Sequence, residues 1–152
     1  MRNLEETKNR AGELYRSNFH CCEAILMAVC EQLDYENDLL LKIASPFGGG
    51  MTANGSACGS LVAAYLCMGI FKGRSSAKES RDAANSAADR IYKKFCEKYG
   101  SAECRNIIGY DRKDPKAVEL YAKKVKCEIC IPLAKEVTGW ILEELEQKNE
   151  YK

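Results

Sequence analysis

Residues 46–69, PFGGGMTANGSACGSLVAAYLCMG, join a glycine-rich segment to an almost uninterrupted apolar run. Pro46 and the glycines after it are expected to end any preceding helix, because proline lacks a backbone N–H and glycine loses the most conformational freedom in a helix. The apolar residues that follow predict a helix from Ala57 to Phe71, with Ser56 as its N-cap. Cys58 would then lie in the first turn of a buried helix.

The segments on both sides of this stretch also space their apolar residues as helices do. Besides a short helix over residues 39–44, helices are expected over 4–17, 19–33, 57–71, 77–99, 102–108, 115–126 and 132–146. The chain contains no alternating strand pattern of useful length, no internal repeat and no interior linker. The sequence therefore predicts an all-α fold, a single compact helical domain of about seven helices over residues 1–152.

Capping residues mark several of these expected helix boundaries. The expected N-caps, besides Ser56, are Asn18, Ser76 (with Glu79 as a capping box), Ser101 and Asp114. Gly100 and Gly109 are expected just after the ends of two helices, because glycine adopts the left-handed conformation without strain. Pro115 and Pro132 suit the first turn of the last two helices, where no backbone N–H is needed.

Charge and hydropathy narrow the classes of partner. The chain has 23 basic and 22 acidic residues and a net charge of +1, so no strong field attracts nucleic acid or an anionic membrane. Its N-terminal residues are charged and helical, with no apolar signal segment, and no apolar run is long enough to span a bilayer. We therefore expect no nucleic-acid partner, no membrane association and a cytoplasmic location.

The chain has nine cysteines, which is unusual for a cytoplasmic protein of 152 residues. An odd number of cysteines in a reducing compartment argues against a full set of structural disulfides. Free cysteines either pack as small hydrophobic side chains or act as ligands and redox thiols. Their positions on the expected helices separate these two roles.

One group of cysteines lies at or beside expected helix starts. Cys21, Cys58 and Cys104 follow their expected caps by two or three residues, and Cys127 and Cys130 come shortly before Pro132. Free backbone N–H groups and the helix dipole stabilise a thiolate at such a position, so the thiol pKa is expected to fall. The alternative, that core-filling cysteines fall near helix starts by chance, stays open.

The other cysteines are expected to be packing residues: Cys22, Cys30, Cys67 and Cys96. Cys22 follows Cys21 directly, but adjacent residues of a helix do not face each other, so no vicinal disulfide is expected. His20, the only histidine, is expected either to act as a base or ligand beside Cys21 or to support the helix start.

Two further motifs are less specific. Cys127 and Cys130 form the motif CEIC, whose two sulfurs share a face in an α-helix, and such a motif serves redox couples and metal sites. No second CxxC or CxxH accompanies it, so a self-contained zinc ribbon is not favoured. GGGMTANGSACG (48–59) lacks the GK[ST] ending of a P-loop, and its glycines are expected to let the backbone turn tightly beside Cys58.

Four segments together resemble a known family: HCCEAIL (20–26), IASPFGGGMTANGSACGSLVAA (43–64), KFCEKYGSAECRNIIGYD (94–111) and KCEICIPLAKEV (126–137). This pattern is similar to the C_GCAxxG_C_C family, small bacterial and archaeal proteins described as redox-active and marked by four cysteines and a CGAxxG motif. The resemblance extends from about residue 18 to residue 145. It implies a redox role and does not specify a reaction.

The resemblance also implies which cysteines form the site. The family's first three cysteines match Cys21, Cys58 and Cys104, and its fourth matches Cys127, with Cys130 as the nearby alternative. Its CGAxxG motif is CGSLVA here, so Ser60 stands for the alanine and Ala63 for the last glycine. We expect these departures to alter the detailed geometry of the site and not the fold.

Three functions follow from these observations. The leading hypothesis is a thiol-based redox protein, oxidoreductase-like or otherwise, in which Cys58 is an activated thiolate and Cys21, Cys104 or Cys127 resolves a reversible disulfide. The second is a metal or iron–sulfur protein with the same four ligands. The third is a non-catalytic helical interaction protein, as a homodimer through the alanines of residues 83–88. The sequence identifies no cofactor and no redox partner.

Overall fold

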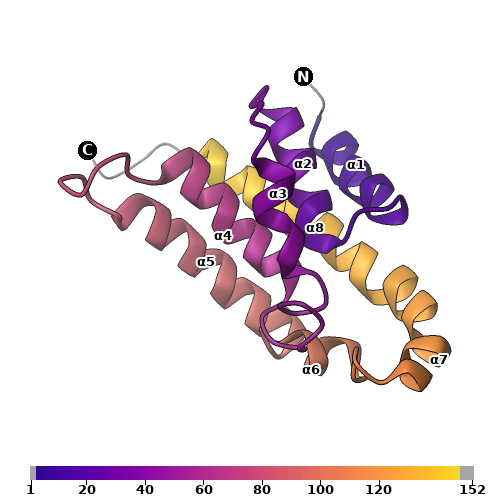
Figure 1. Ribbon diagram of the computed structural model, residues 1–152. Coiled ribbons are helices and arrows are strands. Elements are labelled where there is room, and N and C mark those ends of the chain that lie inside the picture. Colours follow the sequence, from indigo (N-terminus) through magenta and orange to yellow (C-terminus); the bar gives the residue numbers. More distant parts are fainter. Residues whose placement is uncertain (1–2, 148–152) are drawn as a thin grey trace.

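The apolar helix α4 (Gly59–Lys72) lies at the centre of the molecule, whose computed structural model describes residues 3–147. It contacts α2 (Cys21–Gln32), α5 (Asp82–Tyr99) and α8 (Ile131–Glu146). Figure 1 shows α4 and α5 side by side as a long antiparallel pair, with α8 passing behind α2 and α3. Because α4 meets three neighbours, half of its residues are buried, which fits its apolar sequence, while Tyr65 lies on its exposed side.

The N-terminal helix α1 (Leu4–Arg16) packs against α2 and α8. Asn3 and Glu6 begin it with a reciprocal capping box, in which the Asn3 side chain accepts from Glu6 N–H and the Glu6 carboxylate accepts from Asn3 N–H. The short helix α3 (Leu40–Ala44) and a 3₁₀ turn (Ser45–Phe47) then lie beside α2. They bring the chain to the glycine-rich loop that precedes α4.

The C-terminal half contains α6 (Cys104–Ile108), α7 (Pro115–Val125), a π-helical turn (Lys126–Cys130) and α8. α7, the π turn and α8 follow one another without interruption, so residues 115–146 form one helical run. Counted in this way, residues 3–147 form seven helices and no strand, apart from an isolated bridge between Ala57 and Glu103. The predicted all-α fold of about seven helices is confirmed.

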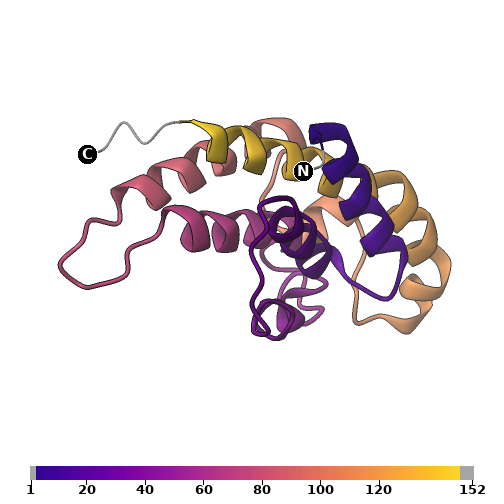
Figure 2. The ribbon, with the colours of Figure 1, turned by 90° about the horizontal axis from the view of Figure 1, so that it is seen from above.

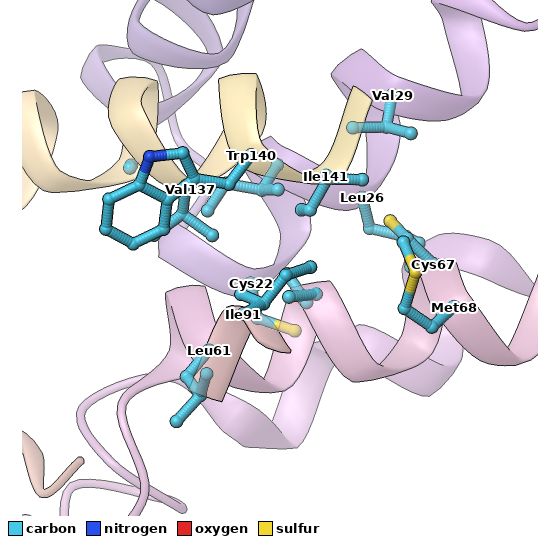
Figure 3. Packing of buried hydrophobic residues seen from close by; sticks show 14 of the residues in the cluster. Cys22, Leu26, Val29, Leu61, Cys67, Met68, Ile91, Val137, Trp140 and Ile141 are labelled. Carbon is cyan, nitrogen blue, oxygen red and sulfur yellow. The ribbon is translucent and has the colours of Figure 1, made fainter. Parts of the chain in front are cut away.

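The two ends of the α4–α5 pair carry different segments, and the hydrophobic core lies between them. In Figures 1 and 2 the connection between α4 and α5 projects at one end, while α6 and the glycine-rich loop lie at the other end of this helix pair. The interior between these ends is a hydrophobic cluster built mainly from α2, α4, α5 and α8. Figure 3 shows Cys22 and Cys67 among aliphatic side chains of this cluster such as Leu26 and Ile141. Each such buried side chain contributes roughly 1.5–3 kcal/mol to stability.

Three of the four cysteines predicted to be packing residues lie in this core. Cys22, Cys30 and Cys67 are at most 1% exposed, whereas Cys96 is half-buried near the end of α5. The alanine-rich face of α5 also packs inside the chain, because Ala87 and Ala88 belong to the same buried cluster. The alanine-rich face, which suggested a homodimer contact, therefore packs mainly in the internal core.

Several predicted helix boundaries are confirmed. Gly100 and Gly109 both have φ of +76° and follow the ends of α5 and α6. Asp114 caps α7 by accepting a hydrogen bond from Lys116 N–H at 3.0 Å, and Pro115 occupies the first turn. Local capping chemistry is sufficient at these positions because no tertiary contact competes with it.

Other predicted caps are wrong by a few residues. α2 is capped by His20 rather than Asn18, and α4 by Cys58 rather than Ser56, because Ser56 is held in the bridge to residues 103–104. Glu103, not Ser101, is the residue before α6, although the Ser101 hydroxyl accepts from Glu103 N–H.

The predicted capping box of Ser76 and Glu79 does not open a helix. The two residues are hydrogen-bonded to each other, but they form an exposed turn, and α5 begins only at Asp82. The carboxylate of Glu79 accepts from Ser75 N–H and the Arg74 guanidinium donates to nearby carbonyls, so the turn satisfies its own polar groups.

Within residues 3–147, no helix is long and apolar enough to cross a bilayer.

Candidate functional site

The loop between α3 and α4 contains a run of five residues with positive φ, from Gly49 to Ala53. The run includes Met51 and Thr52, with φ of +63° and +51°, and a β-branched residue such as threonine rarely adopts this conformation. Each non-glycine residue in the left-handed region costs about 1–2 kcal/mol. Strain of this kind persists only where the surrounding structure fixes the backbone, and it is frequent at functional sites.

Hydrogen bonds to the segment around α6 hold this loop. Arg105 binds the carbonyl oxygens of Asn54 and Gly55 through its guanidinium, and its own N–H donates to Gly55 O. Gly50 packs so closely that a Cβ on it would lie 2.5 Å from Cys104 Cβ. The loop is therefore a rigid support for the start of α6.

A short antiparallel bridge then places two of the cysteines. Cys58 N–H donates to Ala102 O at 2.8 Å, and Cys104 N–H donates to Ser56 O at 2.7 Å. Cys58 and Cys104 are each one residue from the bridged pair, so their side chains lie on the same side of it. Cys58 is the N-cap of α4 and Cys104 is the first residue of α6.

The third cysteine, Cys21, is the first residue of α2 and lies against Gly59. A Cβ at position 59 would overlap the Cys21 sulfur, so only glycine fits here beside Cys58. The neighbouring Cys22 points into the core instead, as expected for adjacent residues of a helix.

The fourth cysteine around this cavity is Cys130, whereas the family resemblance favours Cys127 with Cys130 as the alternative. Cys130 lines the same cavity as Cys21, Cys58 and Cys104, whereas Cys127 is exposed and lines a separate surface pocket beside Arg16. Neither residue lies at a helix start, because the helical run continues through them.

The π turn explains why the two cysteines of the CEIC motif separate. Ile131 N–H donates to Lys126 O, five residues back, so this turn is wider than an α-helical one and residues three apart no longer share a face. Pro132 gives a reason for the wider turn, since it has no N–H and its ring would collide with the carbonyl four residues earlier in an α-helix.

The four cysteines surround one cavity of about 410 Å³. Its remaining wall combines aromatic and aliphatic side chains with a few polar ones, among them Tyr15, Phe19, His20, Ser60, Ile107, Ile108, Tyr110, Arg112, Lys123, Lys126 and Leu133. Cys21, Cys58 and Cys104 are only 8–9% exposed, and Cys130 is half-buried. A cavity of this size and composition suits a small ligand or a small cofactor.

Every pair among these four thiols interacts electrostatically. After burial, the charge of Cys58 is the largest influence that raises the pKa of Cys21, of Cys104 and of Cys130. Cys58 is therefore the central sulfur of the group.

Burial raises the pKa of all four thiols, to about 11 for Cys104. The predicted fall in thiol pKa is therefore wrong, because desolvation of the charged form outweighs the favourable helix start. Cys58 has the strongest opposing effect from hydrogen-bond donors: the N–H groups of Ser60 and Leu61 and the Ser60 hydroxyl lower its pKa. The protein as described holds these sulfurs mainly as neutral thiols, with Cys58 the best supplied with donors for an anion.

Two further side chains act on Cys130. The Tyr15 hydroxyl donates to the Cys130 sulfur and lowers its pKa, against the larger effect of burial. Burial and the nearby sulfurs raise the pKa of Tyr15, so this hydroxyl stays protonated as a donor. Lys126 Nζ lies over the Tyr15 ring, 4.9 Å from its centre, in cation–π geometry.

His20 supports the start of α2, as one of its two predicted roles required. Its Nε2 donates to Ser45 O at 2.9 Å, so Nε2 carries the proton, and Glu23 accepts from His20 N–H at 3.0 Å. Its Nδ1 is buried and has no hydrogen-bond partner among residues 3–147. The contacts therefore orient the ring at the cavity wall and connect α2 to the 3₁₀ turn.

All nine cysteines are free thiols in the structure. Over residues 3–147, no three side chains of His, Cys, Asp or Glu converge as ligands of a single metal ion. The four cavity cysteines surround a shared space and do not form a closed chelate around one point.

These features agree with a comparison against protein families. A family described as "Putative redox-active protein (C_GCAxxG_C_C)" matches residues 19–144. The chain belongs to this family. No curated protein and no solved structure matches it. The C_GCAxxG_C_C description is consistent with a cysteine-based redox role, and the four cysteines around the cavity are the groups that could perform it.

Ser60 and Ala63 are the two residues at which the sequence is expected to depart from the family motif. Ser60, in place of alanine, is 1% exposed and its hydroxyl acts on Cys58. Ala63, in place of glycine, is fully buried in the core cluster, where its methyl group is accommodated. The first departure changes the environment of the central sulfur, and the second changes only the core.

Sequence reasoning missed several residues of this site. Tyr15 and Arg112 have no sequence signal for the site, and Ser60 is marked only by its departure from the family motif, although all three line the cavity. Arg112 lies between two short helices, where helical periodicity gives no signal. Only the CGSL motif contained a usable hint, since a polar residue two positions after Cys58 faces the start of the helix.

Proposed function

We propose that this protein is a small redox protein whose working group is a reversible thiol–disulfide couple with Cys58 as its central sulfur. The observation that carries the proposal is that Cys21, Cys104 and Cys130 all have Cys58 as their strongest electrostatic neighbour around one cavity. Disulfide formation needs an attacking sulfur that reaches a partner sulfur, and Cys58 lines the same cavity as three candidate partners.

The chemistry of the couple is simple. Two pocket thiols form one S–S bond and give up two protons and two electrons to a disulfide of a partner, which is cleaved to two thiols. The raised pKa of Cys58 slows its reaction at neutral pH, while the donors from Ser60 and Leu61 stabilise the thiolate when it forms. Such a couple is therefore shielded from unspecific oxidation and responds to a partner that enters the cavity.

A second candidate is a cluster-binding redox protein. The specific observation in its favour is that four cysteines from separate segments line one cavity. An iron–sulfur cluster spreads its four thiolate ligands around a shared core and deprotonates them, so raised thiol pKa values do not oppose it. Cys21, Cys58, Cys104 and Cys130 would be its ligands.

One experiment separates the two candidates. The protein is purified anaerobically without a metal-affinity tag, and its metal content, visible spectrum and free thiols before and after mild oxidation are measured. Reversible loss of two thiols in metal-free protein, with a disulfide mapped to Cys58, supports the couple. Stoichiometric iron with visible bands that disappear in Cys58→Ala supports the cluster and overturns the couple. The variant Cys67→Ala, which alters a core cysteine of the same helix, is the control in both cases.

A further inference from the structure

The wall of the cysteine cavity has an unbalanced charge. Three cations line it, Arg112, Lys123 and Lys126, and no aspartate or glutamate of residues 3–147 lines it with them. The whole chain, by contrast, has nearly equal numbers of basic and acidic residues. A local excess of one sign at a cavity attracts ligands of the opposite sign.

These cations differ from many others of the molecule in their contacts. On the helix faces, Arg10 binds Glu31, Arg90 binds Glu144 and Lys94 binds Glu143. Arg112 is instead hydrogen-bonded to the Tyr110 hydroxyl at 3.3 Å, and Lys126 lies over the Tyr15 ring. Arg112 and Lys126 thus contact aromatic residues of the cavity, and within residues 3–147 neither forms an ion pair with a carboxylate.

The cations also lie close to the sulfurs. Arg112 lowers the pKa of Cys104 and of Cys130, against the larger effect of burial, and Lys126 does so for Cys130. Arg112 and Lys123 are exposed and Lys126 is half-buried, so they form the rim of the cavity. A molecule that reaches the sulfurs passes this rim.

We propose that the cavity binds a small anionic disulfide, one with carboxylate groups, with Arg112, Lys123 and Lys126 as its anion-binding rim. The redox step rests on the proposed thiol–disulfide function, whereas the binding does not. In that step the S–S bond of the ligand breaks, one S–S bond forms between two pocket sulfurs, and the two thiol protons pass to the two released thiols. A volume of about 410 Å³ accommodates a ligand of this class.

The test compares three disulfides that differ mainly in charge: dithiodipropionate (anionic), bis(hydroxyethyl) disulfide (neutral) and cystamine (cationic). The rate at which each oxidises the reduced protein is measured for wild type, Arg112→Gln, Lys126→Gln and the control Lys124→Gln. Lys124 follows Lys123 but does not line the cavity. Comparing each variant with wild type cancels the intrinsic reactivity of the disulfides.

We expect the ratio of the anionic to the cationic rate to fall roughly three- to tenfold for each pocket cation removed and to stay within about twofold in the control. The preference should also weaken as salt is raised, because the rim is solvent-exposed. An unchanged ratio in both pocket variants overturns the anionic ligand, and if a pocket disulfide still forms, the proposed redox function stands.

A non-exchanging ligand separates binding from chemistry. Thiodipropionate has the same carboxylates but a thioether in place of the disulfide, and its binding is measured by calorimetry. Binding that weakens in Arg112→Gln and Lys126→Gln, in a protein that no disulfide oxidises, supports the anionic site and overturns the thiol couple. No binding and no charge preference overturns the proposed site.

Discussion

The cavity and the hydrophobic core both contain cysteines, and α2 and α4 supply some to each. Cys21 and Cys22 are adjacent on α2, yet the first lies at the cavity and the second is enclosed by the core. On α4, Cys58 begins the helix at the cavity, and Cys67 lies in the core. One residue type therefore has two physical roles, and the direction of the side chain decides which.

The two groups also differ in what surrounds the sulfur. Around Cys67 the neighbours are aliphatic side chains and other core cysteines, and burial, followed by the charges of Cys30 and Cys22, raises its pKa far above the ordinary value. Around Cys58, donors from Ser60 and Leu61 oppose burial, and a cationic rim lies nearby. The difference teaches that two buried thiols of one helix differ in the polar groups that surround them, and not in exposure.

The largest expected effect is the contrast between Cys58→Ser and Cys67→Ser. Cys58→Ser should abolish the reversible loss of thiols on mild oxidation, whereas Cys67→Ser should retain it. Cys67→Ser should instead lower the free energy of unfolding by about 1–3 kcal/mol, because a hydroxyl is buried among apolar groups. Thiol titration and urea unfolding check the two parts, and loss of the couple in both variants would contradict the separation of roles.

Two glycines of α4 should respond in opposite directions to alanine. Gly59→Ala places a methyl group on the Cys21 sulfur and should destabilise the protein by about 1–3 kcal/mol and slow pocket oxidation. Gly69→Ala is the matched control, since nothing lies within 4 Å of its Cβ, and it should stabilise the helix by about 0.5–1 kcal/mol. Thermal unfolding measures both, and equal effects would show that helix propensity alone explains Gly59.

The core thiols should make stability depend on pH in the alkaline range. Burial raises the pKa of Cys30 to about 11 from an ordinary 9, so its contribution is present below pH 9 and is lost as pH rises through 11. A two-unit difference corresponds to roughly 2–3 kcal/mol at most. Urea unfolding between pH 8 and pH 11 should show a flatter profile for Cys30→Ala than for wild type. Parallel profiles would mean that Cys30 does not contribute to the pH dependence.

The smallest expected effect concerns Ser60. Its hydroxyl lowers the pKa of Cys58, so Ser60→Ala should raise that pKa and slow alkylation of Cys58 at pH 8 by roughly two- to fivefold. Cys127 in the same sample is the internal control, because it is exposed and lies outside the cavity. Mass spectrometry of alkylated peptides measures both rates, and an equal change at the two cysteines would point to a global effect.

The sequence by itself determined the helices and some of their ends. Helical periodicity predicts α1, α2, α4 and most of α5, because apolar faces and helix propensity act over a few turns. Gly100, Gly109 and Asp114 end or begin helices as predicted, since their chemistry is local. Membership of the C_GCAxxG_C_C family also followed from sequence order and spacing.

Only the tertiary structure decided which fourth cysteine lines the cavity, how the thiols ionise and which charges surround the cavity. Cys127 and Cys130 are equivalent in an ideal α-helix, and the π turn before Pro132 rotates only Cys130 into the cavity. The thiol pKa is raised, and not lowered as the sequence predicts, because desolvation depends on neighbours that are far apart in the chain. Arg112, Lys123 and Lys126 form one rim because folding brings them to the four sulfurs. No local sequence pattern predicts that these residues lie together.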